Sequence, residues 1–550
     1  MKTNDKKIKL WWGLSLAAIM MTFSCSDDFT NRPPEDRYVD GNFFKTDDQV
    51  LASTSPLYAR TWFGFTDKAS FPIGDGRSGN YRGGWQTYVR NVTEATEPEL
   101  RSTWSAFFNT VAQCNAVIRN IDAYAGPEVS EGIRRHGIAE ARFMRGMAYL
   151  YLVRLWGPVP LIEDNTKSLT STDIKRNTIE SVYEFVIRDF QYAAENLPTE
   201  PLQAGRLTSW SAKGMLAKTH LTRASYRSAG SGTRNADDLA AAKLYAGDVC
   251  KNSGLTLMQD YWELFRTQND NNREALVSLQ WIWNSGYGGG NPLPSQFAYS
   301  SDITGFSDGW GGWQGATSDL VKYYIDNQRD SIRRKATIFF DQDYYSYMHM
   351  RKFDGDGREY YINLKFAGQT DRSMAPIKKY MPGPPIDNDK KGAQQSTDNN
   401  TYLLRLSEVY LDYAEAILGN DAQTSDGDAL QYFNAVRTRA GMPELSVLTE
   451  TTIREEKRIE FAMEHQYWFE LVKWYYRNPA AMKAYVGAQD RGNPTVTVVP
   501  NSNPRQWTFT STNPEYYELA DEKFYLPIPA TDLSAMPSLR DEPVDYEFTN

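Results

Sequence analysis

Apolar residues dominate the part of the chain between residues 138 and 162. Residues 139–156 contain no proline and favour helix, and Gly157 with Pro158 then stops a helix. From 147 to 156 apolar side chains cover nearly every side, which predicts a central helix buried by neighbours on several faces. A membrane span is the competing interpretation, but three charges that would be expensive in a bilayer interrupt the run: Arg142, Arg145 and Arg154.

Five further stretches have the composition and spacing of helices. In residues 103–124 apolar side chains recur at spacings of three and four, and residues 46–60 begin with Thr46 as an N-cap. Pairs of such helices joined by short turns are typical of tetratricopeptide repeats, although no clean repeat consensus is present. The pattern predicts a mainly α fold, with helices at residues 46–60, 103–124, 179–196, 209–227 and 236–252.

The helical pattern breaks between residues 274 and 399. Residues 277–283 alternate apolar and polar side chains, which predicts a strand. Asp354-Gly-Asp356-Gly resembles half a calcium loop, but the closing glutamate of an EF-hand is missing, and a hairpin turn is the favoured interpretation. Helix is expected to resume at Tyr402. The other elements predicted in this region are a helix at 317–334 and strands at 344–347 and 360–366.

The N-terminus indicates export. Four lysines precede an apolar run at residues 10–21, as in a signal peptide spanning residues 1–24. Cys25 follows a small residue, as in a bacterial lipobox, although Thr22 and Phe23 depart from the usual pattern. The alternative is an ordinary signal peptide cut near Ser24. We expect Cys25 to be acylated, because several acyl chains on one residue anchor a protein stably to a membrane.

Composition narrows the function classes. The net charge of −9 argues against a nucleic-acid binder, which needs a basic face. The four histidines lack metal-ligand spacing, and no nucleotide-binding or hydrolase motif stands out, so we expect no metal, no cofactor and no enzyme activity. Cys114 and Cys250 are either a buried pair or separate thiols, and separate thiols are favoured because both lie in helical sequence.

Short motifs occur in order between residues 138 and 537. They are Glu140-Ala-Arg142-Phe143, Trp156-Gly-Pro158-Val-Pro160-Leu, and the segments 403–416, 435–442, 453–461 and 524–537. Together they resemble the motifs of the SusD/RagB family, surface lipoproteins of Bacteroidetes, and Ser26-Asp27-Asp28 resembles the surface-sorting signal of such lipoproteins. Asp532 and Met536 stand where the family usually has Glu and Asn, departures that should not alter the fold.

The resemblance implies a fold and an organisation. The fold would be a SusD-like α-superhelix of irregular tetratricopeptide-type helix pairs with a loop- and strand-rich insertion. Residues 1–24 would be the lipoprotein signal peptide, 25–45 a tether, and 46–550 one SusD-like domain. Within that domain the resemblance implies a helical-repeat half at 46–265, a loop- and strand-rich region at 266–400, and C-terminal helical motifs at 401–550.

Charged residues on one predicted helix face have two interpretations. Arg405, Glu408, Asp412 and Glu415 lie at spacings of three and four. A glycoside hydrolase would use two such carboxylates across a bond. We favour an ion-pair ladder to cations on neighbouring helices, because basic partners are abundant: Arg437, Arg439, Arg454 and Arg458.

Aromatic residues carry the remaining functional signal. Sugar rings present C–H faces that stack on aromatic side chains while polar groups bind their hydroxyls. Two long segments rich in glycine and aromatics, 63–87 and 286–315, therefore predict a shallow ligand site, with structural roles for the rings as the equal alternative. Trp281 is expected in the core and Trp283 is undecided. The candidate ligand contacts are Trp85, Tyr287, Trp310, Trp313, Trp283, Tyr81, Asp75, Arg77, Asn80 and Arg82.

The resemblance also implies a function. The chain would be a lipid-anchored, surface-exposed outer-membrane protein that captures oligosaccharide for a SusC-like TonB-dependent transporter. Peptide or protein capture, as in the RagB branch, is the close alternative, and a surface glycoside hydrolase is the more distant one.

Overall fold

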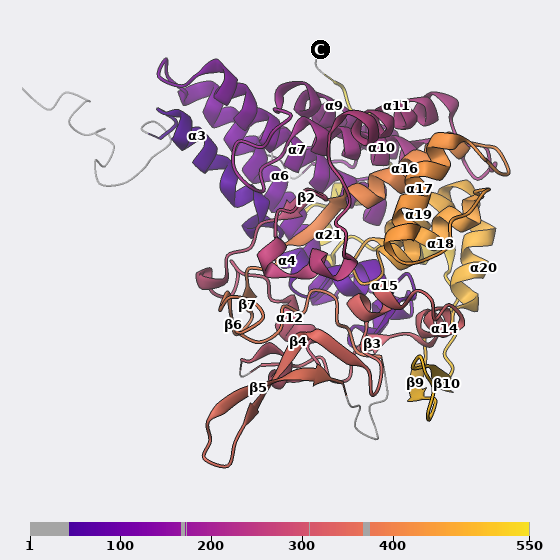
Figure 1. Cartoon of the computed structure of the whole chain (residues 1–550). Coiled ribbons are helices and arrows are strands. Elements are labelled where there is room, and N and C mark those ends of the chain that lie inside the picture. Colours follow the sequence, from indigo (N-terminus) through magenta and orange to yellow (C-terminus); the bar gives the residue numbers. More distant parts are fainter. Residues whose placement is uncertain (1–42, 167–170, 172, 307, 367–374, 549–550) are drawn as a thin grey trace, which may run out of the picture.

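The computed structural model describes residues 43–548 except 167–170, 172, 307 and 367–374. The expected signal peptide, Cys25 and most of the tether lie outside the described residues. Helices dominate, as the sequence predicts, and the strands form small two-stranded sheets (Figure 1). Among the described residues, no helix is both long enough and apolar enough to cross a membrane.

The helix predicted to be central is α7 (Glu131–Trp156). The hydroxyl of Ser130 caps its first turn, and Gly157, with a φ of 70°, ends it. Nearly every side chain from Gly137 onward is buried, because α3, α6 and α9 pack around it. The expectation of a core helix is confirmed, although the helix begins earlier than the apolar run does, in the polar residues after Ser130.

Successive helices pack side by side. In the N-terminal half, α6 contacts α7, α7 contacts α9, α9 contacts α10 and α10 contacts α11, which confirms the predicted pairs. The C-terminal helices (orange in Figure 1) continue the stack, since α16 packs on α10 and α11. The helices are α3 (Asp47–Thr54), α4 (Phe63–Thr66), α5 (Gln86–Val89), α6 (Pro98–Tyr124), α9 (Ile179–Asn196), α10 (Ser209–Tyr226), α11 (Ala236–Asn252), α12 (Leu293–Phe297), α13 (Ser301–Thr304), α14 (Ser318–Asp326), α15 (Ser331–Thr337), α16 (Leu406–Leu418), α17 (Gly427–Arg439), α18 (Glu450–Glu460), α19 (Tyr467–Arg477), α20 (Pro479–Ala488) and α21 (Ala530–Ala535).

Most of the strands lie in the lower part of the molecule in Figure 1, whereas β2 lies higher, among the helices. Each strand pairs antiparallel with one other strand. Gly357 N–H donates to the Asp354 carbonyl in the turn between β4 and β5, which confirms the predicted hairpin. The strands are β1 (Tyr81–Arg82), β2 (Ala275–Leu279), β3 (Gly315–Ala316), β4 (Tyr344–Phe353), β5 (Glu359–Lys365), β6 (Gly392–Ala393), β7 (Ser396–Thr397), β8 (Thr401–Arg405), β9 (Asn493–Val498) and β10 (Trp507–Asn513).

Several element boundaries differ from the prediction. The helix expected at 46–60 ends at Thr54, where 3₁₀ turns follow, and the strand expected at 277–283 ends at Leu279. Two further differences have a clear physical cause. Helix does not resume at Tyr402, because residues 401–405 pair with β2 and the helix starts only at Leu406. The helix expected at 317–334 is two helices. Asn327 leaves the helical conformation after α14. The N–H of Asp330 then donates to the carbonyl of Asn327 and closes a turn before α15.

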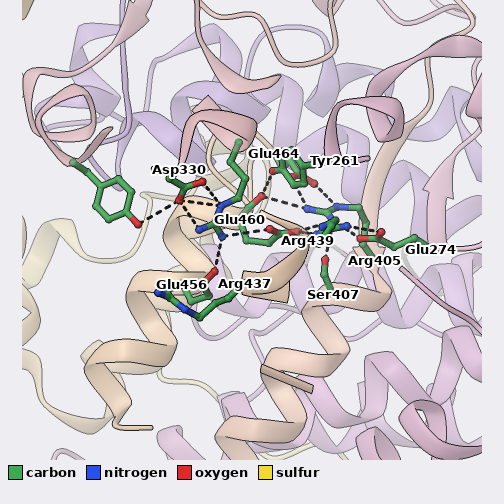
Figure 2. Close-up of polar contacts among 12 residues, drawn as sticks. Tyr261, Glu274, Asp330, Arg405, Ser407, Arg437, Arg439, Glu456, Glu460 and Glu464 are labelled. Atoms are coloured by element: carbon green, nitrogen blue, oxygen red, sulfur yellow. Dashed lines mark hydrogen bonds and ion pairs between the residues drawn. The ribbon is translucent and has the colours of Figure 1, made fainter. Parts of the chain in front are cut away.

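A buried ion network surrounds Arg405, at the junction of β8 and α16 (Figure 2). Its guanidinium donates to both oxygens of Glu464, at 2.8 and 2.9 Å, to Glu274 at 2.6 Å and to Glu460 at 3.1 Å. Arg439 donates to Glu274 and Glu460 as well. Because all five side chains are almost fully buried, each charge depends on the others for compensation.

The network extends further through Glu460. Arg333 lies 3.5 Å from Glu460 and donates to Glu456 and Asp330. Burial alone would raise the pKa of Glu460, but Arg439, Arg405 and Arg333 lower it to about 2. The network thus joins β2, β8, α15, α17 and α18, which lie far apart in the sequence.

The acidic face of α16 forms the expected ion-pair ladder, but with other cations. Lys218 pairs with Glu408 at 2.6 Å, and Lys457 pairs with Asp412 at 2.5 Å and Glu415 at 2.6 Å. The four arginines named as partners pair elsewhere: Arg437 with Glu456, Arg439 with Glu274 and Glu460, Arg454 with Glu450 and Arg458 with Asp319. Since these α16 carboxylates are buried, they cannot act on a substrate at the surface.

The two described cysteines are free thiols, as the sequence favours. Cys114 is buried in α6 and Cys250 is half-buried in α11.

We predict that Arg405→Met lowers the free energy of unfolding by about 3–5 kcal/mol, because it leaves buried carboxylates uncompensated. Urea denaturation followed by tryptophan fluorescence would measure this. Arg358→Ala, in the exposed β4–β5 turn, is the control and should change stability by about 0.5 kcal/mol or less. Equal stability of the two variants would contradict a central role for the network.

Candidate functional site

The two segments rich in glycine and aromatics meet in the structure, as predicted. β1 of the first segment pairs with β3 of the second, with Tyr81 opposite Ala316 and Arg82 opposite Gly315. Asp67 of the first segment accepts hydrogen bonds from Tyr287 and Gln296 of the second, each at 2.7 Å. Segments more than 200 residues apart in sequence therefore build one region, below the helical layers in Figure 1.

The first segment is not the open loop that its glycines suggest. It forms the short helix α4, a π-helical turn at Pro72–Gly76 and β1, and most of it is buried. The carboxylate of Asp75 accepts the backbone N–H groups of Met463 and His465, at 3.0 and 2.8 Å. Burial raises the pKa of Asp75 to about 6.

Four predicted ligand contacts are therefore corrected to structural residues. Asn80 bonds Asp75, and Arg77 stacks 3.9 Å over Trp468 and donates to the carbonyls of Lys523 and Phe524. The Tyr81 hydroxyl donates to Gln314. Because these side chains have almost no exposed surface, they cannot touch a surface ligand: Asp75, Arg77, Asn80 and Tyr81.

The remaining predicted residues lie at or near the surface. Tyr287 is 56% exposed, Trp310 is 47% exposed and Trp313 is 54% exposed. Trp85, Trp283 and Arg82 are half-buried. Trp281, expected in the core, is buried, and its indole N–H donates to Thr401 at 3.0 Å.

Trp85 has an unusual backbone conformation. Its φ of 56° and ψ of 49° place it in the left-handed region, which is costly for a bulky side chain. Its indole N–H donates to Glu99 on α6 at 3.0 Å. Strain of this kind is concentrated at ligand-binding sites, so the conformation favours a functional role for the ring.

Trp313 lies against the backbone next to Trp85. A Cβ added at Gly84 would come within 2.9 Å of the Trp313 ring. Glycine at position 84 therefore lets the indole of Trp313 rest on the backbone of the first segment, next to residue 85.

A shallow depression adjoins Tyr287. It has a volume of about 510 Å³ and runs between α4 and the first half of α6, with Gly288 at its rim. The edge of the Tyr287 ring packs on Phe63, with ring centroids 4.9 Å apart. Hydroxyl and amide groups on α6 also line the depression. They were not predicted from the sequence, although their spacing of three and four marks a polar helix face: Ser102, Ser105 and Asn109.

This arrangement suits the binding of a ligand. Exposed rings can stack on apolar faces of a ligand, and the hydroxyl and amide groups of α6 can bind its polar groups. Among the described residues, no three His, Cys, Asp or Glu side chains gather closely enough to hold a metal ion.

Two family models match the chain. The model described as "SusD family" matches residues 221–544, and the model described as "Starch-binding associating with outer membrane" matches residues 49–221.

Similar proteins cover nearly the whole chain. A SusD-like protein of Bacteroides ovatus is 38% identical, over 97% of this chain and 98% of its own length. The starch-binding protein SusD of Bacteroides thetaiotaomicron is 26% identical, over 64% of this chain and 66% of its own. A crystal structure determined with xylogluco-oligosaccharide matches 91% of this chain and 100% of its own, with a TM-score of 0.81 and 37% identity. The family model spans more than half of the chain and the Bacteroides ovatus relative nearly all of it, so the chain belongs to the SusD family.

Proposed function

We propose that this protein is a cell-surface lipoprotein that binds an oligosaccharide and passes it to a TonB-dependent outer-membrane transporter. The ligand would lie across the side chains of Trp85, Tyr287, Trp310 and Trp313, here called the aromatic platform. The observation that carries the proposal is that two segments distant in sequence pack together, that the second of them exposes three aromatic rings, and that one of these, Tyr287, adjoins an open depression.

Carbohydrate is the ligand class that the relatives favour. A protein 37% identical to this chain was crystallised with xylogluco-oligosaccharide, and a more distant relative is named as starch-binding. Stacking rings beside hydroxyl and amide groups are the chemistry that a sugar chain needs. We therefore take xylogluco-oligosaccharide as the first probe, with other glucans and peptides as comparisons.

The membrane location rests on the N-terminal residues and on the family. Residues 1–28 combine a basic segment, an apolar run, Cys25 and an acidic pair. The model that matches residues 49–221 describes proteins associating with the outer membrane. Stacked helices offer a broad surface to a partner protein, as helical-repeat proteins do.

Removing one ring of the platform should weaken binding by about ten- to hundredfold, since stacking on an aromatic side chain contributes roughly 1–3 kcal/mol. Isothermal titration calorimetry with xylogluco-oligosaccharide on Tyr287→Ala and Trp313→Ala would measure this, and melting temperatures should change little because both rings are exposed. Trp85→Ala should also lower the melting temperature, because this ring is half-buried against both hydrophobic cores.

Tyr124→Ala is the matched control. Tyr124 is an exposed ring at the opposite end of α6 from Glu99, and its loss should leave affinity unchanged. Full binding by both Tyr287→Ala and Trp313→Ala would place the site elsewhere. Release of shorter sugars during the titration would instead favour a hydrolase.

We predict that Cys25→Ala produces a soluble protein, because the acyl chains provide the only anchor that we infer. Fractionation of cells into membrane and soluble parts tests this, with Ser24→Ala as a control that keeps the cysteine. Unchanged membrane partitioning of the Cys25 variant would contradict acylation at this residue.

Purification in mild detergent from the native membrane should recover a large β-barrel protein together with this chain. Mass spectrometry of the purified material tests the expectation, and an unrelated lipoprotein purified in parallel shows the background. Repeated recovery without a barrel would count against a transporter partner.

A further inference from the structure

Tyr287 lies in a glycine-rich turn with open space on both sides. Gly286 and Gly288 have φ values of 72° and 98°, and a Cβ at either position would meet no atom within 4 Å. The N–H groups of Gly289 and Gly290 donate to the Gly286 carbonyl, each at 3.1 Å, and hold the turn. Within that turn the ring is oriented by the contacts of its own side chain, with the Phe63 ring and, at its hydroxyl, with Asp67.

Asp67 is built to hold this hydroxyl. It directly follows α4 and is buried, with one carboxylate oxygen bonded to Tyr287 and the other to Gln296 in α12. Both of these partners belong to the second segment, so Asp67 ties the two segments together. A hydrogen bond to an ionised, partly desolvated carboxylate is stronger than one between neutral groups.

We propose that Asp67 is a positioning residue that holds the Tyr287 ring in the orientation in which it stacks on the ligand. The inference rests on the proposed function, since it assumes that Tyr287 contacts a sugar. Asp67 itself needs no contact with the ligand, because it is buried and both of its oxygens accept hydrogen bonds from the protein.

Charged neighbours decide how this contact responds to acid. Lys68 lies 4.0 Å from the Asp67 carboxylate, and Glu99, which holds Trp85, is close enough to repel it. Burial raises the pKa of Asp67, and Glu99 adds to this, whereas Tyr287, Lys68 and Gln296 lower it. As the pH falls through that raised pKa the carboxylate becomes neutral, so affinity should fall toward acidic pH.

A double-mutant cycle tests the proposal. Tyr287→Phe keeps the ring and removes the hydroxyl, and Asp67→Asn keeps the shape and removes the charge. Each should lower affinity for xylogluco-oligosaccharide by about three- to tenfold, and the double variant should be no weaker than the weaker single one. If the loss of affinity in the double variant equals the product of the two single losses, the proposal is overturned, because the Tyr287 hydroxyl and the Asp67 carboxylate would then act independently.

Gln296→Ala is the matched control. It removes the other hydrogen bond of Asp67 but leaves the bond to Tyr287, so it should change affinity less than Asp67→Asn does. An effect as large as that of Asp67→Asn would mean that Asp67 acts through α12 and would overturn the role assigned to Tyr287.

The pH profile gives a second readout that does not require Asp67→Asn to fold. Wild-type affinity should fall as the pH is lowered from neutral through the raised pKa of Asp67, and Tyr287→Phe should lose most of that dependence, because protonation of Asp67 then has no hydroxyl to release. Glu99→Gln should retain it. A profile that is identical in wild type and Tyr287→Phe would contradict the proposal.

The outcome is separable from failure of the proposed function. If Tyr287→Ala binds as tightly as wild type, the ring is not in the site and both proposals fail at this residue. If Tyr287→Ala weakens binding but Tyr287→Phe and Asp67→Asn do not, the platform stands and the positioning role of Asp67 is overturned.

Discussion

Burying Arg405 is the constraint on which much of this structure depends. A guanidinium removed from water is stable only if its charge and its N–H groups are matched, and here Glu274, Glu460 and Glu464 match them. Those acids precede β2 and lie at and just after the end of α18, so the match exists only when distant parts of the chain have converged. Apolar side chains could fill the same space in several ways. The hydrogen bonds of this network, in contrast, form in only one register of β2 against β8.

The register of β2 leads directly to the binding region. Ala275 lies opposite Arg405, and at the end of the strand Gln280 N–H bonds the Tyr58 carbonyl while Trp281 packs against Phe63. The chain then turns through the glycines that present Tyr287. The first segment is held as firmly, since Asp75 and Arg77 bind the backbone of residues 463–465 and 523–524. Helical core, ion network and binding region are thus parts of one packing arrangement.

How much of this the sequence predicts depends on whether the signal is local. Apolar periodicity predicts α9 and α11 to the residue, because amphipathic helices carry their own pattern. It fails for residues 402–405, whose strand exists only because β2 lies beside them. In the α16 ladder, the spacing of the carboxylates predicts that cationic side chains pair with them. Which side chains do so is decided by the packing of α10, α18 and α19, which supply Lys218, Lys457 and Lys473.

The binding region shows the same division. Glycines interleaved with aromatic residues identify both segments, and the exposed rings of Tyr287, Trp310 and Trp313 are among those the composition singles out. The polar residues between them were assigned to the ligand because glycine-rich sequence suggests an open loop, yet Asp75 and Asn80 serve the interior of the protein. No local pattern distinguishes a carboxylate that binds a sugar from one that caps a distant backbone turn, because both are acids among glycines.

The segment 63–87 is held more rigidly than the segment 286–315, and this difference affects how a ligand would be recognised. Trp85 is held in a strained backbone conformation by the buried first segment and by Glu99, so little of its freedom remains to be lost on binding. Tyr287 sits in a turn with open glycines on both sides, and its side chain is oriented by Phe63 and Asp67. Under the proposed function, a fixed ring and a more adjustable one would let a single scaffold keep its affinity for a sugar chain while the glycine-rich segment adapts to branches. Differences in specificity among such proteins would then arise in the second segment, where substitutions do not disturb the core.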